Sequence, residues 1–220
     1  ISSHPEVYGG DELIFFDDLI KEFFFDENTF SINNLNNFNN KNFEDILSKY
    51  IEKLKTLSKN RVFITDKLPI NFKWLGFIKY LLPNAKVIHC KRNAKDICLS
   101  IYKNYFTNPN LNYAYDFVEL IEFYNLYKDL MKFWNKEFPN YMIEVHYEEL
   151  VKNPKHEILN IIKKIELPWN ENCLKFYNNK RAIKTASDTQ VRSKLYSSSI
   201  DYWKKFEKYI NKPFVKLKIS

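Results

Sequence analysis

The spacing of apolar residues in the first third of the chain predicts two helices joined by a loop. Apolar residues recur at helical spacing from Asp11 to Phe25, and Asp11 stands where an N-cap residue would stand. The same spacing returns from Glu44 to Leu57. The Asn-rich stretch between them, residues 28–42, has no sustained period, which is typical of a loop.

Short apolar runs alternate with helical segments in the rest of the chain. Three runs predict strands, at Val62–Ile64, Lys86–Cys90 and Tyr141–Val145. Helical spacing covers residues 72–82, 94–105 and about 115–138, a loop rich in Pro and Asn covers 107–112, and Asn153–Pro154 opens a helix to about residue 165. Strands that alternate with helices of this length predict an α/β fold with a parallel sheet and crossover helices.

Polar residues follow each of the three predicted strands. The pairs are Asp66–Lys67, Lys91–Arg92 and Tyr147–Glu148. Ligands of open parallel sheets bind outside the carboxyl ends of the strands, because the loops that follow the strands form a crevice there. We therefore expect the functional site to include these three pairs.

Composition favours one well-packed domain with an anionic partner. The 220 residues are 45% apolar, which supplies a single large core, so we expect one domain over residues 1–220. A formal net charge of +7 is compatible with nucleic acid, membrane headgroups, a nucleotide or an acidic peptide as the partner. Because the chain has no RNP, helix-turn-helix or zinc signature, we expect no nucleic-acid partner.

The spacing of the cysteines bears on metal binding, and the first residues of the chain bear on its cellular location. Cys90, Cys98 and Cys173 form neither a CxxC pair nor a zinc-ligand spacing, so we expect reduced, buried thiols and no metal. No stretch approaches 18 uncharged apolar residues, so we expect no membrane segment. The start, Ile1–Pro5, has no initiator Met and no signal-peptide pattern. We interpret the chain as a fragment of a longer, cytoplasmic protein.

The residues from Arg92 to Ser100 fit an anion site. Asn93 is a favourable N-cap residue, and Asp96 occupies a capping-box position three residues later. The free N–H groups of such a helix start suit a phosphate, which Arg92 can bind bidentately, and Ser100 lies on the same helix face as Asp96. The alternative, in which Arg92 pairs with a surface carboxylate and Ser100 has no role, stays open.

Several segments of the chain match one known family. They are Thr65–Pro69, Leu82–Ile88, Lys91–Asp96 with Ser100, Tyr147–Val151 with Pro154, and a tail from Thr185 to Trp203. Together they resemble the sulfotransferases that use 3′-phosphoadenosine 5′-phosphosulfate. The resemblance implies a P-loop-NTPase-like fold, with a central parallel sheet flanked by helices and a helical C-terminal region. It also implies an enzyme that moves a sulfuryl group from this donor to a hydroxyl acceptor.

Two positions indicate a branch of that family. Its cytosolic small-molecule enzymes carry a basic His just before Leu-Pro, whereas this sequence has Lys67 there. That feature resembles the tyrosylprotein sulfotransferases and the bacterial sulfotransferases linked to tetratricopeptide repeats, in which the base is a Glu after an HPxV segment. The segment His4–Leu13 matches, and Glu12 occupies the base position. Taken alone, Glu12 would be an ordinary acid of a first helical turn and Lys67 a solvated charge.

The resemblance implies a role for each predicted site residue. Arg92 and Ser100 would fix the 3′-phosphate of the donor, Tyr147 would contact its adenine, and Ser187 would contact its phosphosulfate end. Tyr147 could also be an ordinary half-buried tyrosine.

The two remaining site residues would carry out the reaction. Glu12 would accept the proton of the acceptor hydroxyl, and Lys67 would stabilise the bridging oxygen of the donor. As in phosphoryl transfer, alignment and charge neutralisation matter more than covalent help from the protein. The scheme requires no metal.

The segment that grips the sulfate is not in the printed sequence. The family uses a Pro-x-Ser-Gly-Thr-Thr-like loop for this purpose, and residues 1–220 contain none, so we expect it just before Ile1. Tyr202 also stands before Trp203 where the tyrosylprotein enzymes carry a Lys. We therefore expect the isolated fragment to be inactive or weakly active.

The acceptor and the assembly state stay open at this point. A peptide tyrosine, a glycan and a small molecule all qualify as hydroxyl acceptors, and a homodimer is compatible with the sequence. A nucleotide-binding or phosphoryl-transfer domain of the same P-loop-like fold is the alternative, although the absent G-x-x-x-x-G-K-[ST] motif gives it no support.

Overall fold

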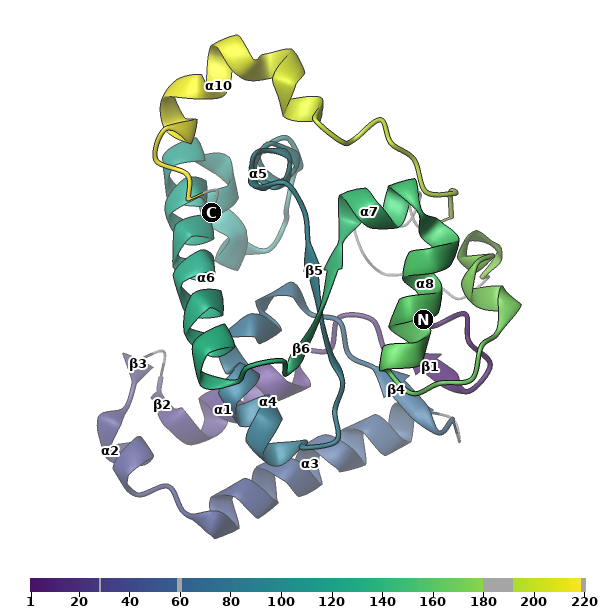
Figure 1. Cartoon of the computed structure of the whole chain (residues 1–220). Helices are drawn as coiled ribbons and strands as arrows, with labels where there is room; N and C mark the ends of the chain where they lie inside the picture. The colour runs from purple at the N-terminus through teal and green to yellow at the C-terminus, as the bar shows by residue number, and fades with distance from the viewer. Residues whose placement is uncertain (28, 59–60, 180–191, 219–220) are drawn as a thin grey trace. The chain divides into compact units, whose positions relative to one another are not determined.

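The chain forms two compact units, each built from two stretches of sequence (Figure 1). The computed structural model describes residues 1–27, 29–58, 61–179 and 192–218. Unit 1 contains residues 1–85 and 168–194, and unit 2 contains residues 86–167 and 195–220. In these described residues, each unit has one pair of parallel strands.

Unit 1 contains the parallel pair β1 (Val7–Gly9) and β4 (Phe63–Thr65). A short antiparallel pair, β2 (Phe25–Asp26) and β3 (Thr29–Phe30), follows its first helix. Its helical segments, in the part of the unit that the structure describes, are α1 (Phe15–Phe24), α2 (Ile32–Asn36), α3 (Asn40–Ser58), α4 (Leu75–Leu81), η1 (Pro69–Trp74), η3 (Glu171–Cys173) and η4 (Phe176–Asn178), where η denotes a 3-10 helix.

The core of unit 1 is an aromatic-rich cluster between α1, α3 and α4. On α1 the buried side chains recur at helical spacing, so one face of this helix is apolar. Each buried Phe or Leu contributes about 1.5–3 kcal/mol. This packing fixes α1 and therefore the loop that leads into it, residues 10–14. The buried members of the cluster are Phe16, Leu19, Ile20, Phe24, Ile46, Tyr50 and Leu81.

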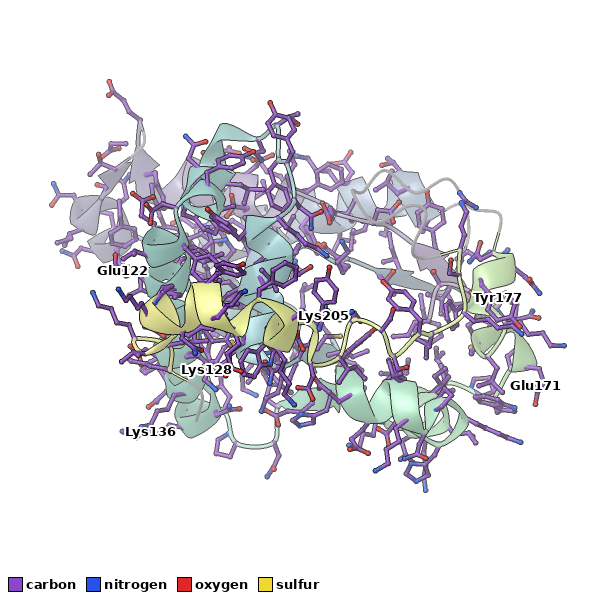
Figure 2. All side chains as sticks on the ribbon, turned by 90° about the horizontal axis from the view of Figure 1, so that it is seen from above. Glu122, Lys128, Lys136, Glu171, Tyr177 and Lys205 are labelled. Carbon is purple, nitrogen blue, oxygen red and sulfur yellow. The ribbon has the colours of Figure 1, made fainter. Side chains whose placement is uncertain are left out.

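Unit 2 contains the parallel pair β5 (Val87–Lys91) and β6 (Met142–His146). The long helix α6 (Phe117–Glu137) is part of the crossover between these strands, and its Glu122 and Lys136 lie on an exposed face (Figure 2). The other helical segments that the structure describes in this unit are α5 (Ala94–Tyr102), η2 (Pro109–Tyr115), α7 (Tyr147–Lys152), α8 (Pro154–Lys164), η5 (Tyr202–Phe206) and α10 (Glu207–Phe214).

The core of unit 2 joins α5 and α6 to the end of the chain. The C-terminal segments η5 and α10 lie beside these helices (Figure 1), and together with Leu217, which follows α10, they complete the cluster. Removing such large side chains from a core typically costs about 3–5 kcal/mol each, so the C-terminal segment is an integral part of the unit. The buried members are Ala94, Cys98, Leu99, Leu120, Ile121, Trp203, Phe214 and Leu217.

The predicted fold class is confirmed by this architecture. All three predicted strands form, each within one or two residues of its expected bounds, and their pairing is parallel. Helices flank both parallel pairs, and the C-terminal region is helical, as predicted. That both units belong to one domain stays a prediction.

The predicted N-cap role of Asp11 is wrong. The helix α1 begins at Phe15, and its N-cap residue is Ile14. Asp11 instead adopts a left-handed backbone conformation with φ of 60°. Its carbonyl accepts a hydrogen bond of 2.8 Å from the Lys67 backbone N–H, so residues 10–11 still follow the path of β4 and the helix cannot yet begin.

The two predicted loops contain short helices. The stretch 28–42 includes β3, α2 and the first residues of α3, and the stretch 107–112 overlaps η2. The Ser31 hydroxyl caps α2, and the Asn108 side chain caps η2. Elements this short do not bury an apolar face of their own, so hydrophobic spacing does not reveal them.

The cysteines are free thiols in different surroundings. All three cysteines are free; Cys98 and Cys173 are buried as predicted, whereas Cys90 is exposed, which corrects the expectation for that residue. Burial raises the pKa of Cys98 to about 12, so its thiol stays protonated at neutral pH. Within the described residues, no helix is long and apolar enough to cross a membrane.

Candidate functional site

Glu12 and Lys67 form an ion pair just beyond the ends of β1 and β4. The parallel pairing continues past the strands, because the Gly10 N–H donates to the Thr65 carbonyl and the Lys67 N–H donates to the Asp11 carbonyl, each at 2.8 Å. The two backbones therefore stay adjacent, and the Lys67 ammonium donates to the Glu12 carboxylate. The side chains are 39% and 58% exposed, so a substrate can reach both.

The close approach of the two backbones requires glycine at position 10. A Cβ atom on Gly10 would lie 2.5 Å from the Thr65 carbonyl oxygen and 3.0 Å from the Leu13 side chain. Atoms cannot approach this closely, so any larger residue would push the loop that carries Glu12 away from β4.

A half-buried carboxyl group, Asp66, lies directly before Lys67. Its Oδ2 accepts a hydrogen bond of 2.8 Å from the Tyr50 hydroxyl of α3, and its Oδ1 accepts a longer one of 3.4 Å from the Asn71 amide. The backbone amide of Leu13 also interacts with this carboxyl. Burial raises the pKa of Asp66, and the three interactions partly offset that rise because they stabilise the charged form.

In unit 2 the start of α5 is capped, as the sequence predicted, by Asn93. Its Oδ1 accepts from the N–H groups of Lys95 at 3.0 Å and Asp96 at 3.2 Å. The backbone N–H of Asn93 donates to the Glu148 carboxylate at 2.8 Å. Three backbone donors at this helix start are thus already used, so the expectation of free N–H groups waiting for a phosphate is wrong for them.

The capping-box role predicted for Asp96 is also wrong, because its carboxyl group points elsewhere. Asp96 is only 2% exposed, and it accepts from the backbone N–H groups of Asp201 at 2.8 Å and Trp203 at 2.9 Å. Asp201 has a left-handed backbone with φ of 57°, at the start of η5. Glu148 takes the capping-box role in place of Asp96, and Asp96 anchors the C-terminal segment.

Arg92, directly after β5, lies over the ring of Tyr147, the first residue of α7. The guanidinium carbon is 5.0 Å from the ring centroid, within the range of a cation–π contact. Its Nη2 donates to the Ser199 carbonyl at 2.5 Å, while its Nε is buried and has no hydrogen-bond partner in the described part of the chain. Among the described residues no carboxylate lies within ion-pair distance of Arg92.

Tyr147 also binds the C-terminal segment. Its hydroxyl lies 3.0 Å from the Ser199 hydroxyl and donates to the Tyr196 carbonyl at 3.2 Å. Arg92, Tyr147 and Ser199 therefore form one cluster, and the sequence had not assigned Ser199 to it. No periodic signal could have found Ser199, because its partners lie more than 50 positions away.

Ser100 and Ser187 are the two remaining predicted residues. Ser100 is half-buried on α5, and its hydroxyl makes no hydrogen bond to a described residue, although its carbonyl accepts from Asn104. Ser187 lies outside the described residues. The described residues contain no group of three or more acidic, His or Cys side chains placed to hold a metal ion.

Two histidines, His4 and His89, make structural contacts. His4 is buried, and its Nε2 lies 2.8 Å from the Pro168 carbonyl. The Nε2 of His89 lies 2.5 Å from the Tyr127 hydroxyl of α6, while its Nδ1 is buried without a hydrogen-bond partner in the described residues. Burial lowers the pKa of His89, and the Glu144 carboxylate at 3.9 Å partly offsets this. A neutral imidazole therefore suits that position.

The chain is similar to known proteins over most of its length. A family model described as the sulfotransferase family matches residues 1–171. The chain is 37% identical over 163 residues to an uncharacterized protein of Aquifex aeolicus (strain VF5), covering 73% of this chain and 21% of that protein.

Two nematode proteins are also similar, and both bear the name "Putative protein-tyrosine sulfotransferase". The Caenorhabditis elegans protein is 28% identical over 134 residues, covering 60% of this chain and 51% of that protein. The Caenorhabditis briggsae protein is 24% identical over 169 residues, covering 73% and 59%. The chain thus spans little more than half the length of these two relatives and about a fifth of the Aquifex protein.

Proposed function

Because this chain belongs to the sulfotransferase family, we propose that it transfers a sulfuryl group from 3′-phosphoadenosine 5′-phosphosulfate to a hydroxyl acceptor. In this reaction the bond between sulfur and the bridging phosphate oxygen breaks, and a bond between sulfur and the acceptor oxygen forms. The acceptor proton leaves with a base, and the negative charge on the phosphate must be stabilised. Adenosine 3′,5′-bisphosphate is the second product.

The observation that carries the proposal is the unsatisfied guanidinium of Arg92. Arg92 is half-buried and its Nε is buried, yet the described residues offer this cation only the Ser199 carbonyl and the ring of Tyr147, and they leave its Nε–H unpaired. A 3′-phosphate would supply the missing charge and acceptor, because guanidinium groups bind phosphate bidentately. The Ser100 hydroxyl, which is half-buried, would be a second ligand of this phosphate.

Two further residues would hold the other parts of the donor. The ring of Tyr147 is half-buried at the end of β6 and offers an aromatic face against which an adenine could pack. Ser187 would contact the phosphosulfate end of the donor. We assign this last role from the family's motif alone.

Glu12 and Lys67 fit the two roles that the chemistry requires. The Glu12 carboxylate is partly exposed, so an acceptor hydroxyl can reach it and give up its proton to it. Lys67 would neutralise the charge that develops on the bridging oxygen. Each role is worth about 10²-fold or more in rate. The ion pair also brings the two side chains together before substrate arrives.

A tyrosine-bearing peptide is the first acceptor to test. The names of the two nematode relatives support it. The net charge of +7 also favours an acidic peptide over a neutral one, because opposite charges raise the association rate. A screen of full-length gene product with labelled donor should include glycans and small phenols beside peptides, since transfer to these alone would reject the peptide.

The donor site can be tested by binding. Adenosine 3′,5′-bisphosphate should raise the melting temperature of the full-length protein, ATP should raise it much less, and Arg92→Ala should remove the increase. Lys86→Ala is the control, because Lys86 is a cation of the same unit that already pairs with Glu166 at 2.5 Å. Equal stabilisation by ATP, or an undiminished increase in Arg92→Ala, would favour a general nucleotide-binding or phosphoryl-transfer domain.

A further inference from the structure

We propose that Asp66 is a positioning residue that holds Glu12 and Lys67 in the arrangement needed for sulfuryl transfer. The proposal rests on the function proposed above and assigns a role to a residue outside the two reacting groups. Asp66 is half-buried and does not face the solvent as Glu12 and Lys67 do. It acts through them and would not contact the substrate.

The carboxyl group of Asp66 ties the end of β4 to α3 and η1. Tyr50, on α3, is only 5% exposed and donates its hydroxyl hydrogen to Oδ2 at 2.8 Å. Asn71, in η1, approaches Oδ1 at 3.4 Å. Tyr50 is itself part of the apolar core, with its ring 5.3 Å from that of Phe16 on α1. The position of Lys67, one residue after Asp66, is therefore set by the packed interior of unit 1.

The same carboxyl group interacts with the loop that carries the candidate base. The backbone amide of Leu13, one residue after Glu12, interacts with Asp66. Leu13 is 7% exposed, so this part of the loop is fixed in the core while Glu12 points outward. Asp66 thus interacts with the residue after Glu12 and precedes Lys67 in sequence, so one carboxyl group is linked to the backbone beside both side chains.

Stability alone does not explain a carboxyl group at position 66. Burial raises its pKa, so the ionised carboxyl costs free energy at this position. An apolar or amide side chain would avoid that cost. The cost is compatible with a site that needs fixed geometry, because a misplacement of about 1 Å can lower a catalytic rate by about 10²-fold.

A second buried acid in unit 1 provides the comparison. Asp17 is 4% exposed and accepts from the Trp74 indole at 2.7 Å and from Lys21 at 2.6 Å. Like Asp66 it joins separate elements through a network of hydrogen bonds, but it sits on α1 and contacts neither Glu12 nor Lys67 in the described structure. Asp17→Asn is therefore a control that should lower the stability of unit 1 and leave the positions of Glu12 and Lys67 unchanged.

The test uses full-length gene product, labelled donor and the acceptor that the screen identifies. Asp66→Asn should lower kcat by about 10-fold or more, with the KM for the donor and the melting increase from adenosine 3′,5′-bisphosphate unchanged. Tyr50→Phe, which removes one hydrogen bond and no charge, should lower kcat less, and it keeps the test open if Asp66→Asn folds poorly. Asp17→Asn should lower the melting temperature and leave kcat unchanged at a temperature where it is folded.

A double substitution separates positioning from general damage. If Asp66 acts through Glu12, then Asp66→Asn should reduce the residual kcat of Glu12→Gln by less than about two-fold, because residues that act as a unit are not additive. Full multiplication of the two effects would overturn the proposal. So would a loss of kcat in Asp17→Asn equal to that in Asp66→Asn at matched stability.

Hydrogen exchange separates this proposal from the proposed function. In Asp66→Asn the amides of Leu13 and Lys67 should exchange faster than in the parent, whereas in Asp17→Asn they should not. Unchanged exchange at both amides would overturn the positioning role whatever the activity. Faster exchange in a protein whose Glu12→Gln variant keeps full turnover would instead reject the assigned base and leave the ordering role of Asp66 standing.

Discussion

Unit 1 and unit 2 each place a cation directly after a parallel strand, but the two cations have opposite surroundings. Lys67 of unit 1 has a carboxylate partner and is 58% exposed. Arg92 of unit 2 is half-buried, rests on an aromatic ring and donates to a backbone carbonyl, and no described carboxylate neutralises it. Both cations thus lie at the end of a strand. The side chains around each cation determine whether its charge is already paired within the protein or can be paired by a ligand.

The two sites also differ in what holds them together. In unit 1 the backbones of residues 10–11 and 65–67 pair directly, and Gly10 permits the approach. In unit 2 side chains bind a distant segment, since Arg92, Tyr147 and Asp96 all bind residues 196–203. Substitutions in one unit should therefore affect chemistry, and substitutions in the other should affect binding and the fold of the C-terminal segment.

The largest effect should come from Glu12→Gln. Loss of the base should lower kcat by about 10²- to 10⁴-fold, because the amide cannot accept the acceptor proton. The melting increase from adenosine 3′,5′-bisphosphate should stay the same, since unit 2 is unchanged. Steady-state kinetics and thermal shift measure the two quantities.

Glu22→Gln is the matched control for that substitution. Glu22 belongs to another exposed Glu–Lys pair of unit 1, with Lys49 at 2.5 Å, and exposed pairs contribute little to stability. It should keep full activity. Retained turnover in Glu12→Gln would reject the assigned base.

The next effect in size should come from Asp96→Ala in unit 2. It removes a buried acceptor from two backbone N–H groups, so the free energy of unfolding should fall by about 2–4 kcal/mol. Asp116→Ala removes a similar pair of bonds, to Val118 and Glu119, at the exposed start of α6, and should cost only about 1 kcal/mol. Urea unfolding curves compare the two; equal losses would mean that burial at Asp96 adds nothing.

Gly10→Ala should have a smaller effect on stability, and that effect should be limited to unit 1. The added Cβ meets a backbone oxygen at 2.5 Å, so the loop must shift at a cost of about 1–3 kcal/mol. Turnover should fall as Glu12 moves from Lys67, while bisphosphate binding should not change. Weakened bisphosphate binding with normal turnover would contradict the division between the units.

The smallest effect should appear in the pH dependence of unit 2. His89 has a pKa below its usual value of 6.5 in the folded protein, so the unfolded chain binds the proton first as pH falls. Stability from neutral His89 is therefore present above pH 6.5 and is lost progressively below it. His89→Gln should flatten the melting temperature between pH 7 and 5 in a thermal series, and an unchanged slope would assign the dependence to other groups.

The sequence predicted local features well and distant ones poorly. The three strand ends and the Asn93 cap follow from neighbouring residues, and all are confirmed. Asp96 was assigned to the wrong partner because its true partners lie 105 and 107 positions away. Asp11 was misread because a backbone contact with Lys67 outweighs its capping preference. The roles of the site residues stay predictions.

One consequence concerns the order in which the protein is synthesised. The core of unit 2 needs Trp203, Phe214 and Leu217, whereas α5 and α6 leave the ribosome more than 60 residues earlier. The apolar faces of these two helices must stay uncovered until residues 203–217 have been synthesised. We expect nascent chains stalled before residue 203 to be sensitive to protease in this region and to bind chaperones that recognise exposed apolar helices.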